Sequence, residues 1–293
     1  MVYDVLNRYH SQAASRETIV TVAPSGADYT SIKAAIAGVT PTAGAPVRIY
    51  VRNGTYNEIQ ITGKDYLTIE GESRAGVVMV SDGLRTDVDP VSGQRYVDMA
   101  QAAKHGLAIS HYMTIRNMTI RVNDVKYCVH MDNNVVFRAV FDNVLFQHSN
   151  GFPVGCGGWA SQEMVFEDCV FQKLGDPENN GVEGSHGIFW HNWNDQAAAT
   201  RLIMTDCASI NCGFVELFEL GSEYTDLCTF TRCASGDALR GVYVTVTDYY
   251  WNGGGQGKPN VPYCINILTV DGALALQYSA EDRVNLEDHV YAI

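Results

Sequence analysis

The chain repeats one short β-type pattern at a nearly constant interval. The fourth residue of each copy is polar and the fifth is apolar or Cys, and the copies are Thr114–Ile120, Val140–Phe146, Val165–Phe171, Ile203–Ser209 and Thr229–Ser235. Their fourth residues lie 26, 25, 38 and 26 positions apart. A coil that lays each strand on the same strand of the previous turn requires such spacing, whereas an antiparallel sandwich does not. The repeat therefore predicts an all-β fold, a right-handed parallel β-helix.

The fifth residues of the copies form a predicted interior stack. They are Met118, Val144, Cys169, Cys207 and Cys233. The chain has eight Cys residues and none forms a CxxC pair. Burial inside a coil accounts for them as reduced thiols, without a disulfide framework or a zinc site.

A second set of strands falls between the copies of the repeat. Its members are Tyr127–Asp132, Gly187–His191, Gly213–Phe218, Gly241–Thr247 and Cys264–Leu268. Because successive side chains of a strand point to opposite faces, the aliphatic positions are expected inside and the alternate positions outside.

Composition and charge limit the classes of function. The chain has 33 acidic residues against 20 Lys and Arg, for a net charge of −13, which argues against a nucleic-acid partner. No stretch approaches the roughly 20 apolar residues of a membrane span. Residues 1–20 lack the apolar run of a secretory signal. We expect residues 1–18 to be a leader that can dock onto a larger particle, and residues 19–293 to form one β-helix domain.

The beginning of the expected domain carries a helix signal. Asp28 and Thr30 mark a helix start, and Ile32, Ala35, Ile36 and Val39 follow at helical spacing. A short amphipathic helix at this point would cap the open first coil, where an uncovered edge invites aggregation.

Three strings at this end carry a family resemblance: Asp28–Ile36, Ile49–Glu58 and Leu67–Glu72. They resemble the opening of pectin methylesterases and of the wider pectin-lyase-like β-helix superfamily, whose Gly-x-Tyr-x-Glu motif matches Gly54, Tyr56 and Glu58. The resemblance implies the fold and a carbohydrate-related function, with a structural role for Glu58. The catalytic segments of the methylesterases have no convincing counterpart in this chain, so ester hydrolysis is not carried over.

The outward positions of the second strand set supply the candidate site. Carboxylates and imidazoles can transfer protons during glycoside cleavage, and flat aromatic rings can stack on pyranoses. The candidate catalytic residues are Glu216, His191, Asp132 and His130. The candidate substrate-binding residues are Trp193, Phe189, Phe218, Tyr243, Tyr249 and Trp251. Both histidines are open to a second interpretation as surface or ladder residues, and no metal or cofactor is expected.

Phage tailspikes and capsule depolymerases have a similar fold. The first hypothesis is therefore a phage tail protein that binds, and cuts as a hydrolase or lyase, a bacterial surface polysaccharide. It would reside in the virion after assembly in the host cytoplasm, as a homotrimer that contacts other tail proteins. One alternative is a glycan-binding adhesin or structural tail component without turnover. Another is a secreted, extracellular pectinesterase-like enzyme.

Overall fold

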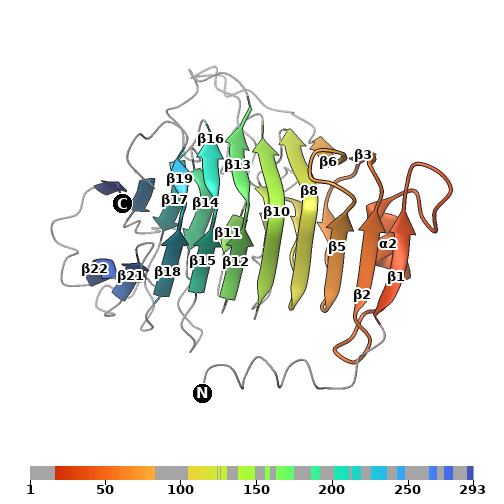
Figure 1. The fold of residues 1–293 in the computed structure, drawn as a ribbon, viewed down its shortest axis with the longest axis horizontal. Coiled ribbons are helices and arrows are strands. Elements are labelled where there is room, and N and C mark those ends of the chain that lie inside the picture. Colours follow the sequence, from red (N-terminus) through yellow and green to blue (C-terminus); the bar gives the residue numbers. More distant parts are fainter. Residues whose placement is uncertain are drawn as a thin grey trace, which may run out of the picture.

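The protein is a solenoid of stacked β coils (Figure 1). The computed structural model describes residues 17–82, 105–123, 125, 127–130, 138–148, 156–158, 163–174, 186–191, 201–210, 213–218, 226–235, 243–247, 264–268, 274–279 and 289–292. Two sheets wind along it, with 15 and 8 described strands. Among the strand pairs within these ranges, all but two are parallel, which confirms the predicted right-handed parallel β-helix.

The larger sheet contains the strands of the sequence repeat. Its main path is β1 (Thr18–Val22), β2 (Val47–Val51), β5 (Leu67–Gly71), β8 (Met113–Asn123), β10 (Ala139–His148), β12 (Glu163–Glu167), β15 (Arg201–Thr205), β18 (Asp226–Thr231), β21 (Cys264–Leu268) and β22 (Leu274–Ser279). Its branch strands are β3 (Gly54–Asn57), β6 (Val77–Asp82), β13 (Val170–Lys173), β16 (Ala208–Ile210) and β19 (Ala234–Ser235).

The smaller sheet is built from the second strand set. It contains β4 (Ile61–Thr62), β7 (His105–Ala108), β9 (Tyr127–His130), β11 (Cys156–Gly158), β14 (His186–His191), β17 (Gly213–Phe218), β20 (Tyr243–Thr247) and β23 (His289–Ala292). One predicted member, Cys264–Leu268, instead pairs in the larger sheet as β21.

The register of the larger sheet confirms the sequence repeat position by position. Thr114 pairs with Val140, Val140 with Val165, Val165 with Ile203 and Ile203 with Thr229. The interval of 38 residues therefore contains an insertion that leaves the stacking intact.

The polar fourth position of the repeat is a bend with left-handed backbone. Asn117, Asn143, Asp168, Asp206 and Arg232 all have φ between 51° and 56°. Asn and Asp are the non-glycine residues that adopt this conformation most readily. Asn143 Nδ2 donates to Asn117 Oδ1 at 2.9 Å, so the bend side chains also bond along the stack.

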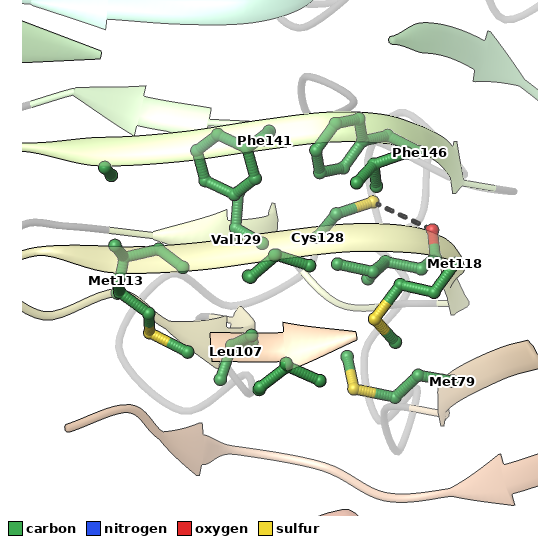
Figure 2. Packing of buried hydrophobic residues seen from close by; sticks show 14 of the residues in the cluster. Met79, Leu107, Met113, Met118, Cys128, Val129, Phe141 and Phe146 are labelled. Carbon is green, nitrogen blue, oxygen red and sulfur yellow. Dashed lines mark hydrogen bonds between the residues drawn. The ribbon is translucent and has the colours of Figure 1, made fainter. Parts of the chain in front are cut away.

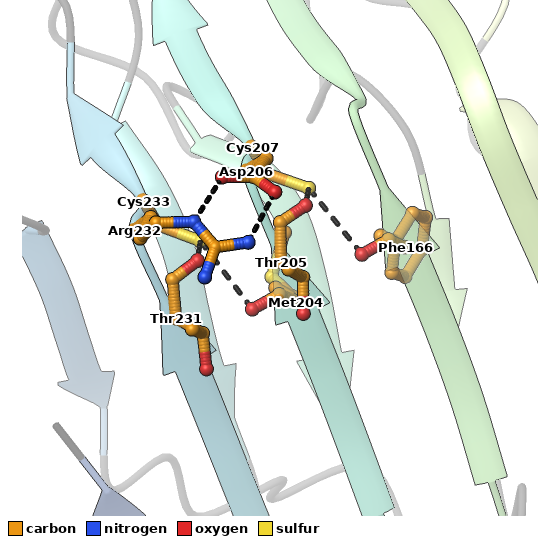
Figure 3. A network of polar contacts seen from close by, with 8 residues as sticks. All are labelled: Phe166, Met204, Thr205, Asp206, Cys207, Thr231, Arg232 and Cys233. Atoms are coloured by element: carbon orange, nitrogen blue, oxygen red, sulfur yellow. Dashed lines mark hydrogen bonds and ion pairs between the residues drawn. The ribbon is translucent and has the colours of Figure 1, made fainter. Parts of the chain in front are cut away.

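Arg232 is an unusual residue for such a bend, and an ion pair holds it there (Figure 3). Its Nε and Nη2 donate to the two carboxylate oxygens of Asp206 at 2.6 and 2.5 Å. The hydrogen bond from Arg232 holds the pKa of the Asp206 carboxyl below its ordinary value.

The thiols after the last three bends are stacked inside the coil, as predicted. Cys169, Cys207 and Cys233 each place Sγ 3.3 to 3.5 Å from two backbone carbonyl oxygens. All are free thiols, as is Cys128. Hydrogen bonding to Cys169 and burial raise the pKa of Cys207, and hydrogen bonding to Cys207 and burial raise that of Cys233.

Side chains from both sheets meet in the core (Figure 2). The labelled residues are Met79, Leu107, Met113, Met118, Cys128, Val129, Phe141 and Phe146. Aromatic rings stack from coil to coil. The ring centroids of Phe141 and Phe166 are 4.7 Å apart, and those of Phe146 and Phe171 are 5.0 Å apart. This continuous apolar column is the main source of stability for a solenoid.

The predicted capping helix is present as α2 (Ile32–Gly38), which buries Ile32, Ala35 and Ile36, but the start predicted from Asp28 and Thr30 is wrong because Ser31 caps the helix. Glu58 fixes its start, because its two carboxylate oxygens accept from Ile32 N and Lys33 N at 2.6 Å each. Ser31 is the N-cap and accepts from Ala34 N at 3.1 Å. The structural role expected for Glu58 is therefore confirmed.

Both ends of the described solenoid depart from simple strand stacking. At β1, Asp28 Oδ2 accepts from the N–H and hydroxyl of Thr21 at 2.8 and 2.7 Å, which occupies an edge donor of the strand. At the other end, β22 and β23 pair antiparallel with β21 and β20. The contact at β1 leaves one donor fewer for the addition of a further strand.

We expect Glu58→Gln to lower the free energy of unfolding by about 1–2 kcal/mol, because a neutral amide cannot accept from both helix N–H groups. Urea unfolding followed by circular dichroism measures the change. Glu167→Gln, an exposed carboxylate on β12, is the control and should stay within about 0.5 kcal/mol of the wild type. Equal effects of the two substitutions would contradict the capping role.

We expect Cys169 and Cys207 to resist alkylation in the folded protein at mildly alkaline pH, because both are buried and the pKa of Cys207 is raised. Mass spectrometry after iodoacetamide treatment, with and without denaturant, measures the modification. Labelling of either thiol in the native protein at the rate seen in denaturant would show that the stack is open.

Candidate functional site

The register of the smaller sheet places three of the predicted site residues in one row. His130 pairs with Gly157, Gly157 with Phe189, and Phe189 with Glu216. The row continues to Ala108 on one side and Thr245 on the other. The three residues, which the alternation of side chains along each strand had placed on the same face, therefore occupy one row of the sheet.

The row also separates the candidate catalytic residues. His130 and Glu216 are three coils apart, which corresponds to about 14 Å at the usual spacing of neighbouring strands. That separation exceeds the reach of a hydrogen bond, so these two residues do not act as a direct acid–base pair.

His191 lies closer to Glu216 along the solenoid than His130 does. It is the last residue of β14, and it pairs with Phe218 on the adjacent strand, two residues beyond Glu216. Glu216 and His191 therefore lie on neighbouring coils, on strands in direct contact.

The predicted outward display of His130 is wrong, because only 3% of this residue is exposed. Its ring stacks at 4.6 Å on Tyr127 and at 5.9 Å on His105. The alternation of side chains along a strand gives only the direction in which His130 points. It does not predict that the rings of Tyr127 and His105 stack on His130. The burial favours the ladder interpretation of His130.

The remaining predicted residues divide between described strands and the rest of the chain. Phe218 ends β17 and pairs with Thr247 at the end of β20, whereas Tyr243 begins β20, at the opposite edge of the sheet. Asp132, Trp193, Tyr249 and Trp251 lie outside the described residues.

The carboxyl edge, where β7, β9, β14, β17 and β20 end, carries a feature that the sequence reasoning missed. Tyr66 lies in the turn after β4 and Tyr112 in the turn after β7, and their rings stack 5.0 Å apart at an interplanar angle of 11°. Asp65 Oδ1 accepts from His111 N at 3.1 Å and also from Ser110 Oγ. The shared string Tyr-x-Thr-Ile at Tyr66 and Tyr112 was the available signal.

A charged row on the larger sheet has a structural explanation. Glu70 Oε2 accepts from Arg48 Nη1 at 3.0 Å and from Arg116 Nη2 at 2.7 Å. Burial raises the pKa of the Glu70 carboxyl, but the hydrogen bonds from Arg116 and Arg48 outweigh burial and bring it below its ordinary value. Arg48 Nη2 also donates to Glu17 Oε2 at 2.5 Å, so two carboxylates balance two guanidinium groups and the row does not form a second candidate site.

The described ranges contain no cluster of three or more His, Cys, Asp or Glu side chains that could hold a metal ion. In the same ranges, no helix has the length and apolar character needed to cross a membrane.

Comparison with known proteins gives likenesses of fold. No protein-family model matches the chain, and no curated protein matches it. Similar solved structures include pectin methylesterase PemA from Erwinia chrysanthemi, with 17% identity over 73% of this chain and 78% of that one and a TM-score of 0.43. The pectin methylesterase from Yersinia enterocolitica has 13% identity over 86% and 87%, with a TM-score of 0.48.

Pectate lyase Pel9A is a further similar structure, with 16% identity over 87% of this chain and 63% of that one and a TM-score of 0.49. The similarity to these proteins is a similarity of fold. The chain is a right-handed parallel β-helix whose chemistry must be derived from its own residues.

Proposed function

We propose that the protein binds a polysaccharide along the carboxyl edge of the smaller sheet and cleaves it as a hydrolase or lyase. The observation that carries the proposal is the pairing of β14 with β17, which brings His191 and Glu216 onto neighbouring coils. The row through Phe189 runs across the strands, so an extended polymer would lie parallel to the solenoid axis and contact several coils.

In this proposal Glu216 is the general acid or base and His191 holds or moves the proton. Hydrolysis and lyase chemistry both need one group that transfers a proton at the glycosidic bond or beside it. His130 is left out of the catalytic set because it is buried and lies three coils from Glu216. Phe189 and Phe218 would contribute apolar contacts to sugar rings.

The proposed setting is a phage tail, with the polysaccharide on the bacterial surface and a homotrimer as the working form. The free thiols of Cys128, Cys169, Cys207 and Cys233 are compatible with assembly in the reducing cytoplasm of the host.

A non-catalytic adhesin is the second candidate. It is favoured by the separation of His130 from Glu216, which leaves fewer catalytic partners around Glu216 than the sequence suggested. An adhesin would use the same edge for binding and would release no product.

We expect wild-type protein to release reducing ends from purified host capsular polysaccharide, and Glu216→Gln to lower the rate at least about 100-fold, because a neutral amide cannot transfer the proton. A reducing-sugar assay with size-exclusion chromatography of the products measures cleavage. Glu167→Gln on the larger sheet is the matched control and should retain the wild-type rate.

Binding without release would support the adhesin and exclude the enzyme. If Glu216→Gln released reducing ends at the wild-type rate, residues other than Glu216 would be responsible for cleavage. Release of methanol from methylated pectin, without chain cleavage, would instead support an esterase.

A further inference from the structure

The stacked pair of Tyr66 and Tyr112 is a prominent exposed aromatic feature of the carboxyl edge. Tyr112 is 46% exposed although it is a large aromatic residue. The two rings come from turns on consecutive coils of the smaller sheet and lie nearly parallel. Together they form a flat-sided aromatic block beside the ends of the strands.

The backbone holds this block rigidly. Tyr66 and Tyr112 both have left-handed backbone, with φ of 57° and 55°. Each uses its N–H to bond the next coil, Tyr66 to His111 O at 3.0 Å and Tyr112 to Arg138 O at 2.8 Å. A rigid aromatic surface loses little conformational entropy when a ligand binds to it.

A polar pair flanks the block on the following coils. Arg138 Nε lies 2.9 Å from Glu163 Oε1, and 54% of the Arg138 side chain is exposed. A guanidinium has five N–H donors, and this contact involves one of its nitrogens. Because the charge of Glu163 offsets that of Arg138, the surroundings favour a sugar with hydroxyl groups over one with a net charge.

We propose that Tyr66, Tyr112 and Arg138 form an accessory subsite for a neutral pyranose unit of the polysaccharide. The inference rests on the proposed function and extends its binding surface. The pyranose would contact the aromatic block through its C–H face, and its hydroxyl groups would accept hydrogen bonds from Arg138.

The position of the block sets the length of ligand that can use it. The coil of Tyr112 contains Ala108, and the row from Ala108 to Glu216 spans four coil steps, about 19 Å at the usual strand spacing. Only a chain of several sugars reaches from Glu216 to the subsite, so the subsite would select long polymers over short fragments.

Affinity gel electrophoresis of the full chain tests the subsite, with hydroxyethyl cellulose as a neutral polymer and polygalacturonate as an acidic one. Tyr112→Asn removes the ring while keeping a residue that tolerates left-handed backbone. Tyr112→Phe keeps the ring. Tyr50→Thr, on β2 of the larger sheet, is the matched control for loss of a tyrosine elsewhere.

We expect hydroxyethyl cellulose to retard the wild type, Tyr112→Phe and Tyr50→Thr equally. Tyr112→Asn should bind about three- to tenfold more weakly, the size of one aromatic contact. Arg138→Gln, an exposed substitution, is the second variant and should also weaken binding. Thermal unfolding verifies that each variant is folded.

Several outcomes would overturn the subsite. If both Tyr112→Asn and Arg138→Gln were retarded as strongly as the wild type, the subsite would be rejected. The release assay on capsular polysaccharide would still decide the proposed function. Retardation of the wild type by polygalacturonate alone would exclude a neutral sugar. No retardation of the wild type by either polymer would also reject the subsite, and capsule cleavage would then show whether the proposed function stands without it.

Discussion

The left-handed bend at the fourth position of the repeat is the constraint on which the rest of the structure depends. Two of the bends bond the next coil through their backbone, with Asp168 N donating to Thr205 O at 3.0 Å and Asp206 N to Thr231 O at 2.9 Å. Because these coils bend at the same position of the repeat, the residue after the bend points inward, and Met118, Val144, Cys169 and Cys207 are at most 1% exposed. The thiol stack and the aromatic stacks are consequences of that regularity.

Much of the fold could be predicted because the physics of stacking acts directly on residue spacing. The alignment of Thr114 with Val140 and the burial of Cys207 both follow from an interval of nearly 26 residues. The left-handed bend was not predicted, although a polar residue at its position was noticed. Arg232 shows why: its ion pair to Asp206 replaces the intrinsic preference that Asn has for this conformation.

The candidate site was harder to predict than the fold. Alternation placed Phe189 beside Glu216 correctly, because that relation depends on register alone. It failed for His130, whose burial depends on the rings of Tyr127 and His105. Distances across the strands also depend on the number of intervening coils, and the coil of Gly157 lies between His130 and Phe189.

The interval of 38 residues between Asp168 and Asp206 shows how such a scaffold separates two requirements. Val165 still pairs with Ile203, so the longer interval leaves the strand pairing unchanged. The length and composition of this connection are therefore free to change while the bends stay fixed. A chain built in this way can acquire a new ligand preference by exchanging one connecting segment, with no compensating change elsewhere in its interior.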